Sequence, residues 1–375
     1  MRRRPRPWPT TRARPDVRVL VVCPVANPQD ARISLRMIGA LLEAGHEVTQ
    51  AAPFTAFGVE PRPGVRALDI PRSAGRRRLV AAWAARRLLH REAPRHDLVL
   101  LASPDAVVAA AGLDHPAVVW DVREDVAAAL RIRPWMPARL ARPAGVALRW
   151  AEGRTERTRH LILAEHAYAD RFERGHPVVP NSPWVPDAVP PSGRGRAVYV
   201  GRLTRARGAA ELVELGRRLG AHGIALELIG AADPEVAGML EQASTRGWVD
   251  LVGFLPNDEA LRRIEGATVG LSLLHDEANY RHSMPTKLFE YLARGVPFVS
   301  TPLPLAADLA ESSGGGVIVP FAGVEEACTA VMALNADDAR RQAMADAGRD
   351  WVRVHANWGV DGPAFVRQLE EWAGA

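Results

Sequence analysis

A single lysine marks the stretch of this chain where residue types and spacing best suit chemistry. Lys287 lies in MPTKLFEYLARGVPFVSTP, residues 284–302, and the other 47 of the 48 basic residues are arginines. Pro285 favours the first turn of a helix, and Gly295 favours its end before a buried strand. The N–H groups and dipole at such a helix start attract an anion such as phosphate. Lys287 and Glu290 share one helix face, where a simple surface ion pair is the alternative.

Arginines and glycines at other strand ends could complete an anion site. Arg202 and Arg207 lie in GRLTRARG, residues 201–208, and two guanidinium groups can clamp a diphosphate, although the run could also be an ordinary surface loop. Gly230 and Gly253 each end an apolar run, where glycine either admits a ligand to the backbone or only turns the chain. Together with Glu290 as an acceptor for ribose hydroxyls, these residues predict a nucleotide diphosphate in the second half.

Apolar runs alternate with helical patterns in both halves of the chain. The first half opens with the β-branched run VRVLVV, then a helical stretch and a second apolar run, and the second half restarts the pattern at AVYVGRL. This alternation predicts an α/β protein with doubly wound parallel sheets. Such sheets bind ligands at the carboxyl ends of their strands, which is where the candidate residues fall.

Length and a proline-rich segment predict two domains. The run NSPWVPDAVPPSGRGR, residues 181–196, has the composition of a linker. We expect a disordered basic tail at residues 1–15, a first Rossmann-like domain over 16–188, a second over 189–359, and a C-terminal helix over 360–375 that crosses back to the first domain.

Two segments of the first half carry more specific expectations. Residues 125–158 predict one or two amphipathic helices, broken at Pro134, Pro137 and Pro143. Their arginines and apolar residues suit either a solvated face or a membrane face. The apolar run PVVPN, residues 177–181, predicts another strand.

Composition and charge limit the classes of function. Two distant cysteines, Cys23 and Cys328, exclude a disulfide framework and a thiolate metal site and favour a reducing cytoplasm. No apolar run approaches the ~20 residues of a membrane helix, and no signal peptide is expected. Residues 1–190 hold 30 arginines against 19 acids, whereas residues 191–375 hold 18 basic residues against 24 acids. The first half could therefore meet an anionic partner, such as the inner face of a membrane, and no nucleic-acid partner is expected.

The runs YVGRL, LELIG, VGFL and PTKLFEYLARGVPFVST together resemble the donor-binding half of retaining glycosyltransferases of family 4, which have the GT-B architecture of two facing Rossmann-like domains. DARISLRMIGALLEAGHEV, VVWDVRED and PVVPNSP are similar to segments of the family's first domain, so the resemblance covers most of residues 17–360. It implies transfer of a hexose-type sugar from a nucleotide diphosphate, with a UDP-sugar favoured and no cofactor or metal. The acceptor would be a hydroxyl group of a natural product or of a lipid-linked or cell-surface glycan.

The resemblance also implies roles for individual residues. Arg202, Arg207 and Lys287 would be catalytic, stabilising the charge that develops on the leaving diphosphate. Glu290 would be the second glutamate of the family's Glu-x7-Glu motif and would bind ribose. The further donor contacts would be Gly201, Gly230, Gly253, Phe254, His282, Ser283, Met284 and Pro285, with the base near Gly253 and Phe254. The acceptor-side residues would be Asp30, Arg32, Arg123 and Glu124.

The sequence departs from the family pattern at three points. His282 stands where the first glutamate is expected, Arg123 where histidine is frequent, and ANPQDAR replaces the glycine pair of the first loop. These departures favour, as an alternative, a catalytically degenerate nucleotide-sugar-binding partner of another transferase. GT-B architecture also occurs in nucleotide-sugar epimerases and in pyridoxal-phosphate phosphorylases. A sole lysine would suit a Schiff base, although the position of Lys287 in the helix motif argues against it.

Overall fold

The computed structural model describes residues 16–125, 138–278 and 280–374, so the expected tail at 1–15 lies outside the described residues. The chain forms two compact units. Unit 1 runs to Asn181 and takes up the chain again from Val360, and unit 2 is Ser182–Gly359.

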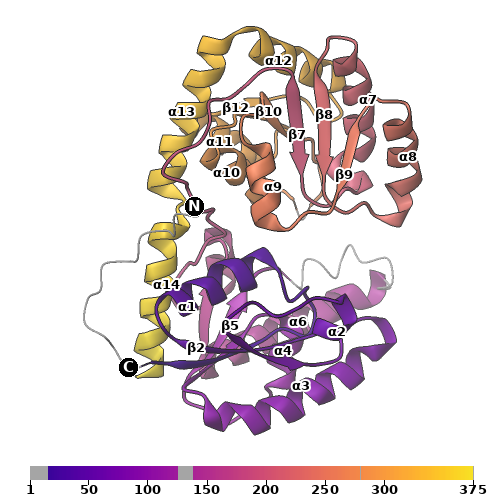
Figure 1. Ribbon diagram of the computed structural model, residues 1–375. Coiled ribbons are helices and arrows are strands. Elements are labelled where there is room, and N and C mark those ends of the chain that lie inside the picture. The colour runs from indigo at the N-terminus through magenta and orange to yellow at the C-terminus, as the bar shows by residue number, and fades with distance from the viewer. Residues whose placement is uncertain (1–15, 126–137, 279, 375) are drawn as a thin grey trace. The chain divides into compact units, whose positions relative to one another are not determined.

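Unit 1 is built on six parallel strands in the order β3-β2-β1-β4-β5-β6, with helices on both faces of the sheet (Figure 1). The strands are β1 (Arg18–Val22), β2 (Glu47–Ala52), β3 (Val65–Asp69), β4 (Leu98–Leu101), β5 (Val118–Val122) and β6 (His160–Leu163). The helices are η1 (Ala31–Ile38), α1 (Gly39–Glu43), α2 (Phe54–Phe57), η2 (Gly75–Arg77), α3 (Arg78–Glu92), η3 (Ala93–Arg95), α4 (Pro104–Ala109), α6 (Ala138–Thr158), η4 (His166–Arg171) and, for most of its length, α14 (Trp358–Ala373).

Unit 2 repeats this design, with its strands in the order β12-β11-β10-β7-β8-β9. The strands are β7 (Arg196–Val200), β8 (Ala225–Ile229), β9 (Asp250–Gly253), β10 (Val269–Ser272), β11 (Phe298–Ser300) and β12 (Gly316–Ile318). The helices are η5 (Arg205–Arg207), α7 (Ala209–Gly220), α8 (Pro234–Thr245), α9 (Asn257–Ile264), α10 (Thr286–Ala293), α11 (Pro304–Ser313), α12 (Val324–Ala336) and α13 (Asp338–His355). Counted from its own first strand, each sheet has the same order, which confirms the predicted α/β class of two doubly wound parallel sheets.

The cores explain why the strands read as continuous apolar runs. Residues 19–22 of β1 are 0% exposed, because helices cover the sheet on both sides. In unit 2, one apolar cluster packs α7, α8 and α12 against one face of the sheet, and a second packs α9, α10 and α11 against the other. Gly270 in β10 lets the ring of Tyr291 approach, since a Cβ there would lie 2.4 Å from two ring carbons. The second cluster thereby fixes α10 on the sheet.

Two expectations for the end of unit 1 are wrong. Pro143 does not break the helix, because it lies within α6, near the start, where its ring removes only one hydrogen bond. Pro134 and Pro137 lie outside the described residues. Residues 177–181 form a single bridge, from Val178 to Leu163, and no strand, since prolines on both sides of the bridge remove ladder donors.

The proline-rich segment is not a free linker, because it packs against unit 2. Ser182 and Ser192 are 0% and 6% exposed. Ser192 Oγ donates to the carbonyl oxygen of Ala267 at 2.7 Å, and Arg341 Nε donates to the Ser192 carbonyl oxygen at 3.3 Å. The division between the units therefore falls at 181/182, where the sequence placed it at 188/189.

Candidate functional site

The strand order of unit 2 reverses between β7 and β10, so the connections that follow these two strands leave in opposite directions. A ligand of a doubly wound sheet binds at this point, beyond the carboxyl ends of the strands. Gly201 directly follows β7, and α10, which carries Lys287, follows β10. The structure brings four predicted residues together here: Gly201, Arg207, Gly230 and Lys287.

Glycines allow the loops around this point to approach one another. Gly201 has φ 125° and Gly230 has φ 149°, and a Cβ on Gly230 would lie 2.0 Å from the carbonyl oxygen of Gly201. Gly208 has φ 81°, and its Cβ would lie 2.3 Å from the carbonyl oxygen of Leu273. Side chains at these positions would therefore force the loops after β7, β8 and β10 apart.

The ammonium group of Lys287 is buried among these loops. The residue is 7% exposed, and Nζ lies 3.5 Å from the ring centroid of Tyr199, which is itself fully buried. A Cβ on Gly201 would lie 3.3 Å from Lys287 Nζ and 3.8 Å from Arg207 Nη1. Among the described residues, Nζ has no hydrogen-bond partner. The ring face compensates only part of the loss of solvation.

The side chains of Lys287 and Arg207 repel one another in the site, and a bound anion would offset this repulsion. Burial, and next the guanidinium of Arg207, lower the pKa of Lys287 well below its ordinary value, while the nearby Glu290 opposes the shift. A phosphate between Lys287 and Arg207 would satisfy the buried donor and remove the repulsion between the two cations. The arrangement is therefore preorganised for a strongly anionic group.

The lowered pKa of Lys287 predicts that nucleotide diphosphate binding takes up protons at pH values between that lowered pKa and 10.5. An anion beside Nζ favours the ammonium form, so it raises the pKa that burial lowered. In the free protein, the unfolded chain binds more protons than the folded one between the folded pKa and 10.5, so the free energy of unfolding rises with pH there. Calorimetric titration of UDP in two buffers of different ionisation enthalpy should show proton uptake, and Lys287→Met should abolish it. Equal heats in both buffers for the unmodified protein would contradict the prediction.

Helix α10 places Glu290 and anchors the site to the sheet. Glu290 is 8% exposed and lies one turn after Lys287. The hydroxyl of Tyr291 accepts from the Val200 amide at 2.9 Å and donates to the Leu271 carbonyl oxygen at 3.1 Å, which ties α10 to β7 and β10. No side chain of the described residues caps the start of α10. The first backbone N–H groups of this helix are therefore available to a ligand bound in front of Pro285.

Arg202 lies apart from this pair of cations. Its Nε donates to Oδ1 of Asp233, the residue before α8, and its side chain is 65% exposed. Its carbonyl oxygen accepts from the Tyr199 hydroxyl at 2.8 Å. An anion that recruits Arg202 has to compete with Asp233 for the guanidinium.

The other predicted donor residues differ in their exposure to solvent. Gly253 has φ 80° and open space around it, and its carbonyl oxygen accepts from the Gly230 amide at 2.7 Å, which joins the loops after β8 and β9. Phe254 is 66% exposed. His282 is exposed, whereas Ser283, Met284 and Pro285 are half-buried in the approach to α10. The structure thus gives the position of the missing glutamate a surface histidine.

Sequence reasoning missed several residues that shape the site. The ring of Tyr199 in β7 lies over Lys287 Nζ, and Tyr291 anchors α10 to the sheet; the run YVG, an aromatic residue close to a glycine, was the signal for the first of them. His275 Nε2 lies 2.9 Å from Glu211 Oε1, and the His275 amide donates to the Ala206 carbonyl oxygen at 3.0 Å. These two contacts link the loop after β10 to α7 and to the segment that carries Arg207.

In unit 1, Arg32 is committed to the fold. It is 5% exposed and donates through Nε at 3.0 Å and Nη2 at 2.7 Å to Asp121. Its Nη1 donates to the Val179 carbonyl oxygen at 2.8 Å and to Asn181 Oδ1 at 3.0 Å. This guanidinium joins η1, β5 and residues 179–181, where the first segment of unit 1 ends.

The remaining acceptor-side residues lie at the carboxyl edge of the same sheet. Asp30 caps η1 by accepting from the Arg32 and Ile33 amides, both at 3.1 Å. Arg123 Nη1 lies 3.6 Å from Asp30 Oδ1, and Nη2 donates to the Ala102 carbonyl oxygen at 2.6 Å. Glu124 is exposed. Asp30 and Arg123 are therefore near one another, while Arg32 faces inward.

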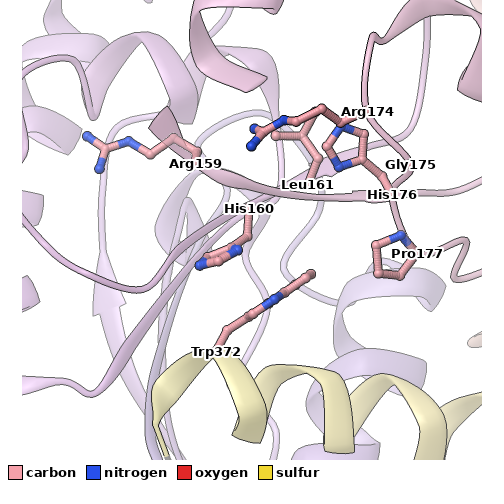
Figure 2. Close-up of a pocket in the computed structure, with 8 residues that line it drawn as sticks. All are labelled: Arg159, His160, Leu161, Arg174, Gly175, His176, Pro177 and Trp372. Carbon is pink, nitrogen blue, oxygen red and sulfur yellow. The ribbon is translucent and has the colours of Figure 1, made fainter. Parts of the chain in front are cut away.

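A cavity of about 190 Å³ lies elsewhere in unit 1. The rings of His160 and Trp372 stack beside it at 4.5 Å (Figure 2). Its lining residues are Arg159, His160, Leu161, Arg174, Gly175, His176, Pro177 and Trp372. His160 begins β6, so the cavity lies at the amino edge of the sheet, opposite Asp30 and Arg123. It contains none of the predicted residues. Among the described residues, no cluster of histidine, cysteine and carboxylate side chains could hold a metal ion.

Gly230→Ala should disrupt the site of unit 2. The Cβ would clash with the Gly201 carbonyl oxygen at a φ that only glycine adopts readily, so we expect a loss of about 3 kcal/mol or more in the free energy of unfolding and loss of UDP binding. Gly253→Ala is the matched control, because it has positive φ but open space, and should cost only about 1–2 kcal/mol. Urea unfolding curves compare the two. Equal losses would show that the contact with Gly201 is unimportant.

Comparison with known proteins finds a family match across most of unit 2. The family described as Glycosyl transferase-like matches residues 207–360, which include Arg207, Lys287 and Glu290. WcaL of Salmonella typhimurium, provisionally named as a colanic acid biosynthesis glycosyltransferase, is 29% identical over 129 residues. The match spans 33% of this chain and 32% of WcaL, or about a third of each.

Solved structures resemble the whole chain. Sucrose-phosphate synthase from Thermosynechococcus elongatus has a TM-score of 0.72 at 16% identity, covering 96% of this chain and 100% of its own. Anabaena Alr3699/HepE, solved with UDP and glucose, has a TM-score of 0.67 at 14% identity, covering 94% and 99%. At such identities the likeness concerns the fold. The chain thus has the fold of GT-B glycosyltransferases, and its residues 207–360 match a glycosyl transferase-like family.

Proposed function

We propose that this protein is a retaining glycosyltransferase that moves a hexose from a nucleotide diphosphate, by preference UDP, to a hydroxyl group. The observation that carries the proposal is the buried ammonium of Lys287, which has no hydrogen-bond partner among the described residues and lies beside Arg207 and Gly201. It stands at the switch point of unit 2, within the segment that matches the glycosyl transferase-like family. Two cationic side chains beside the backbone of a glycine, Gly201, suit the binding of a diphosphate.

A nucleotide sugar as the ligand has separate support. Anabaena Alr3699/HepE was solved with UDP and also with UDP-glucose, and its fold resembles that of this chain over 95% of the length. In our proposal, Lys287 and Arg207 hold the diphosphate, Glu290 accepts hydrogen bonds from the ribose, and the base lies near Gly253 and Phe254. Arg202 exchanges Asp233 for a phosphate oxygen when the donor binds.

The chemistry proposed for this site is stabilisation of a leaving group. The bond from the anomeric carbon to the β-phosphate oxygen breaks, and the diphosphate leaves with the electron pair. The acceptor hydroxyl forms the new bond on the same face, and its proton passes to the departing phosphate. Lys287 and Arg207 offset the charge that grows on that phosphate, without reorganising during the reaction. The acceptor would be recognised by unit 1, with Asp30, Arg123 and Glu124 as candidate contacts.

A donor panel tests the proposal. The full chain is incubated with UDP-, GDP- and dTDP-hexoses, with and without a cell extract as the acceptor source, and nucleotide release is measured. We expect release that depends on the extract, is greatest with a UDP-hexose and is lost in Lys287→Met. Proton NMR of the product should show the anomeric configuration of the donor, and an inverted product would exclude retention.

The same panel tests the alternatives to a transferase, which are a degenerate binding partner and a nucleotide-sugar epimerase. Tight nucleotide binding without release, in the presence of every extract, would identify a binding partner of another transferase. Interconversion of the donor sugar without any acceptor would identify an epimerase. Either result would overturn the proposed transfer reaction.

A further inference from the structure

Three helices of unit 1 expose an unusual number of large apolar side chains. Among the described residues, ten large hydrophobic side chains are strongly exposed, and six of them lie on α3, α4 and α6. They are Leu79 (84% exposed), Val80 (60%), Trp83 (63%), Val108 (68%), Val146 (71%) and Trp150 (64%). We call the basic-apolar face the surface formed by these six residues and the exposed arginines of the same segments, which are Arg76, Arg77, Arg78, Arg87, Arg154 and Arg157.

The three helices cover the same side of the sheet. Connections from β3 to β4, β4 to β5 and β5 to β6 all step across the sheet in one direction, so right-handed crossovers place α3, α4 and α6 on one side. Figure 1 shows α3 next to α4, and the two helices pack together. The six exposed residues therefore belong to one side of unit 1.

Helix α3 shows that its apolar exposure is not a failure of packing. Ala81, Ala85, Leu88 and Leu89 recur at helical spacing and are buried against the sheet. Leu79, Val80 and Trp83 lie on the opposite side of the helix. The helix thus has two apolar stripes, and only one of them has a partner within the chain.

The charge around the outer stripe of α3 has one sign. Residues 70–91 contain seven arginines and no acidic residue. Arg76, Arg77 and Arg78 at the start of the helix are exposed and form no ion pair with a described residue. The guanidinium of Arg87 lies 5.7 Å from the ring centroid of Trp83.

Helix α6 repeats this distribution of charge. Arg154 and Arg157 are exposed and lie on the same side as Val146 and Trp150. The acids of the helix turn inward, because Glu152 and Glu156 are 6% and 2% exposed. Glu156 pairs with His176 at 2.9 Å. The outer side of α6 therefore offers cations and an aromatic ring without carboxylates.

We propose that the basic-apolar face binds an anionic phospholipid bilayer. Tryptophan and leucine side chains insert at the level of the head groups, and the arginines meet lipid phosphates. The apolar residues are distributed over three helices and flanked by exposed arginines, of which Arg76, Arg77 and Arg78 form no ion pair with a described residue. A protein interface instead gathers its apolar residues in a core depleted of charge. None of the described helices is long and apolar enough to cross a membrane, so contact of this kind is peripheral.

Vesicle binding by the full chain tests the proposal. We expect sedimentation with vesicles of phosphatidylglycerol and phosphatidylcholine to exceed that with phosphatidylcholine alone by tenfold or more, and to weaken with salt. Replacing Arg76, Arg77 and Arg78 by glutamate should weaken binding at least about tenfold, since each arginine near the surface contributes. Glutamate suits the first turn of a helix, so this variant should fold. The matched control carries glutamate at Arg246, Arg340 and Arg353 of unit 2 and has the same net charge.

Bilayer insertion is tested separately from charge. Lipids brominated on their acyl chains should quench the protein's tryptophan fluorescence, and Trp83→Phe should remove part of that quenching, whereas Trp248→Phe of unit 2 should not. The proposal is overturned if both arginine variants bind alike, if Trp83→Phe leaves quenching unchanged, or if the chain forms a dimer through this face and ignores vesicles. None of these outcomes depends on transfer activity. Failure of the membrane proposal would therefore leave the proposed glycosyltransferase function untouched.

Discussion

Lys287→Met should weaken UDP binding about a hundredfold or more while making the free protein more stable. Removing one partner of a desolvated charge pair costs several kcal/mol of binding, because the phosphate is then left without its cation. Methionine has nearly the length of lysine and carries no charge, so it fills the space over Tyr199 without the cost of burying an ammonium. The free energy of unfolding should rise by about 1 kcal/mol or more. Calorimetry and thermal unfolding measure the two effects.

Opposite signs of these two effects distinguish a ligand site from a structural ion pair. If Lys287 served the fold, its loss would lower both stability and affinity. Arg207→Met is the companion variant, and it should weaken UDP binding while relieving repulsion at Lys287. Arg202→Met should have a smaller effect on binding, because that guanidinium is already paired with Asp233. Unchanged affinity in both Lys287→Met and Arg207→Met would reject this site.

Arg32→Met should destabilise unit 1 by about 3 kcal/mol, because it leaves the buried carboxylate of Asp121 with only the looser ion pair to Arg123 Nε, 3.6 Å away. The side chains of this pair are 5% and 0% exposed. Urea unfolding followed by circular dichroism measures the loss. UDP affinity should be unchanged, since the residues proposed to bind it belong to unit 2.

Two controls define the Arg32 result. Arg18→Met removes the ion pair with Asp97, whose side chains are 48% and 35% exposed, and should cost far less, because solvent screens this pair. Asp121→Asn combined with Arg32→Met should recover part of the loss, because neither charge then remains buried alone. A small effect of Arg32→Met, equal to that of Arg18→Met, would show that the buried network is dispensable.

The fold could be predicted because each of its determinants is local. Continuous β-branched runs such as VRVLVV, helical spacing and terminal glycines specify the elements one at a time, and right-handed connections leave few ways to order them. The meeting of Gly201, Arg207 and Lys287 follows from the same rules, because the carboxyl ends of β7 and β10 meet at the switch point.

The roles of individual arginines could not be predicted in this way. Arg32 and Arg202 stand beside expected ligand positions in sequence, yet their partners are Asp121 and Asp233, which are 89 and 31 residues away. An ion pair depends on which carboxylate the tertiary structure brings near, and spacing along the chain does not report that. In contrast, Lys287 was conspicuous by its residue type in a chain of arginines, and its buried Nζ has no hydrogen-bond partner among the described residues.

Because the chain has a single lysine, chemical labelling of amines can report on this one site. Apart from the α-amino group, the chain carries one primary amine, and it is enclosed beneath the loop after β7. A lysine whose pKa is lowered by burial has a larger share of the nucleophilic free amine. Reductive methylation or acylation should therefore add one internal mass increment, at a rate set by opening of those loops. Mass spectrometry of that increment would follow occupancy of the site directly, without any knowledge of the acceptor.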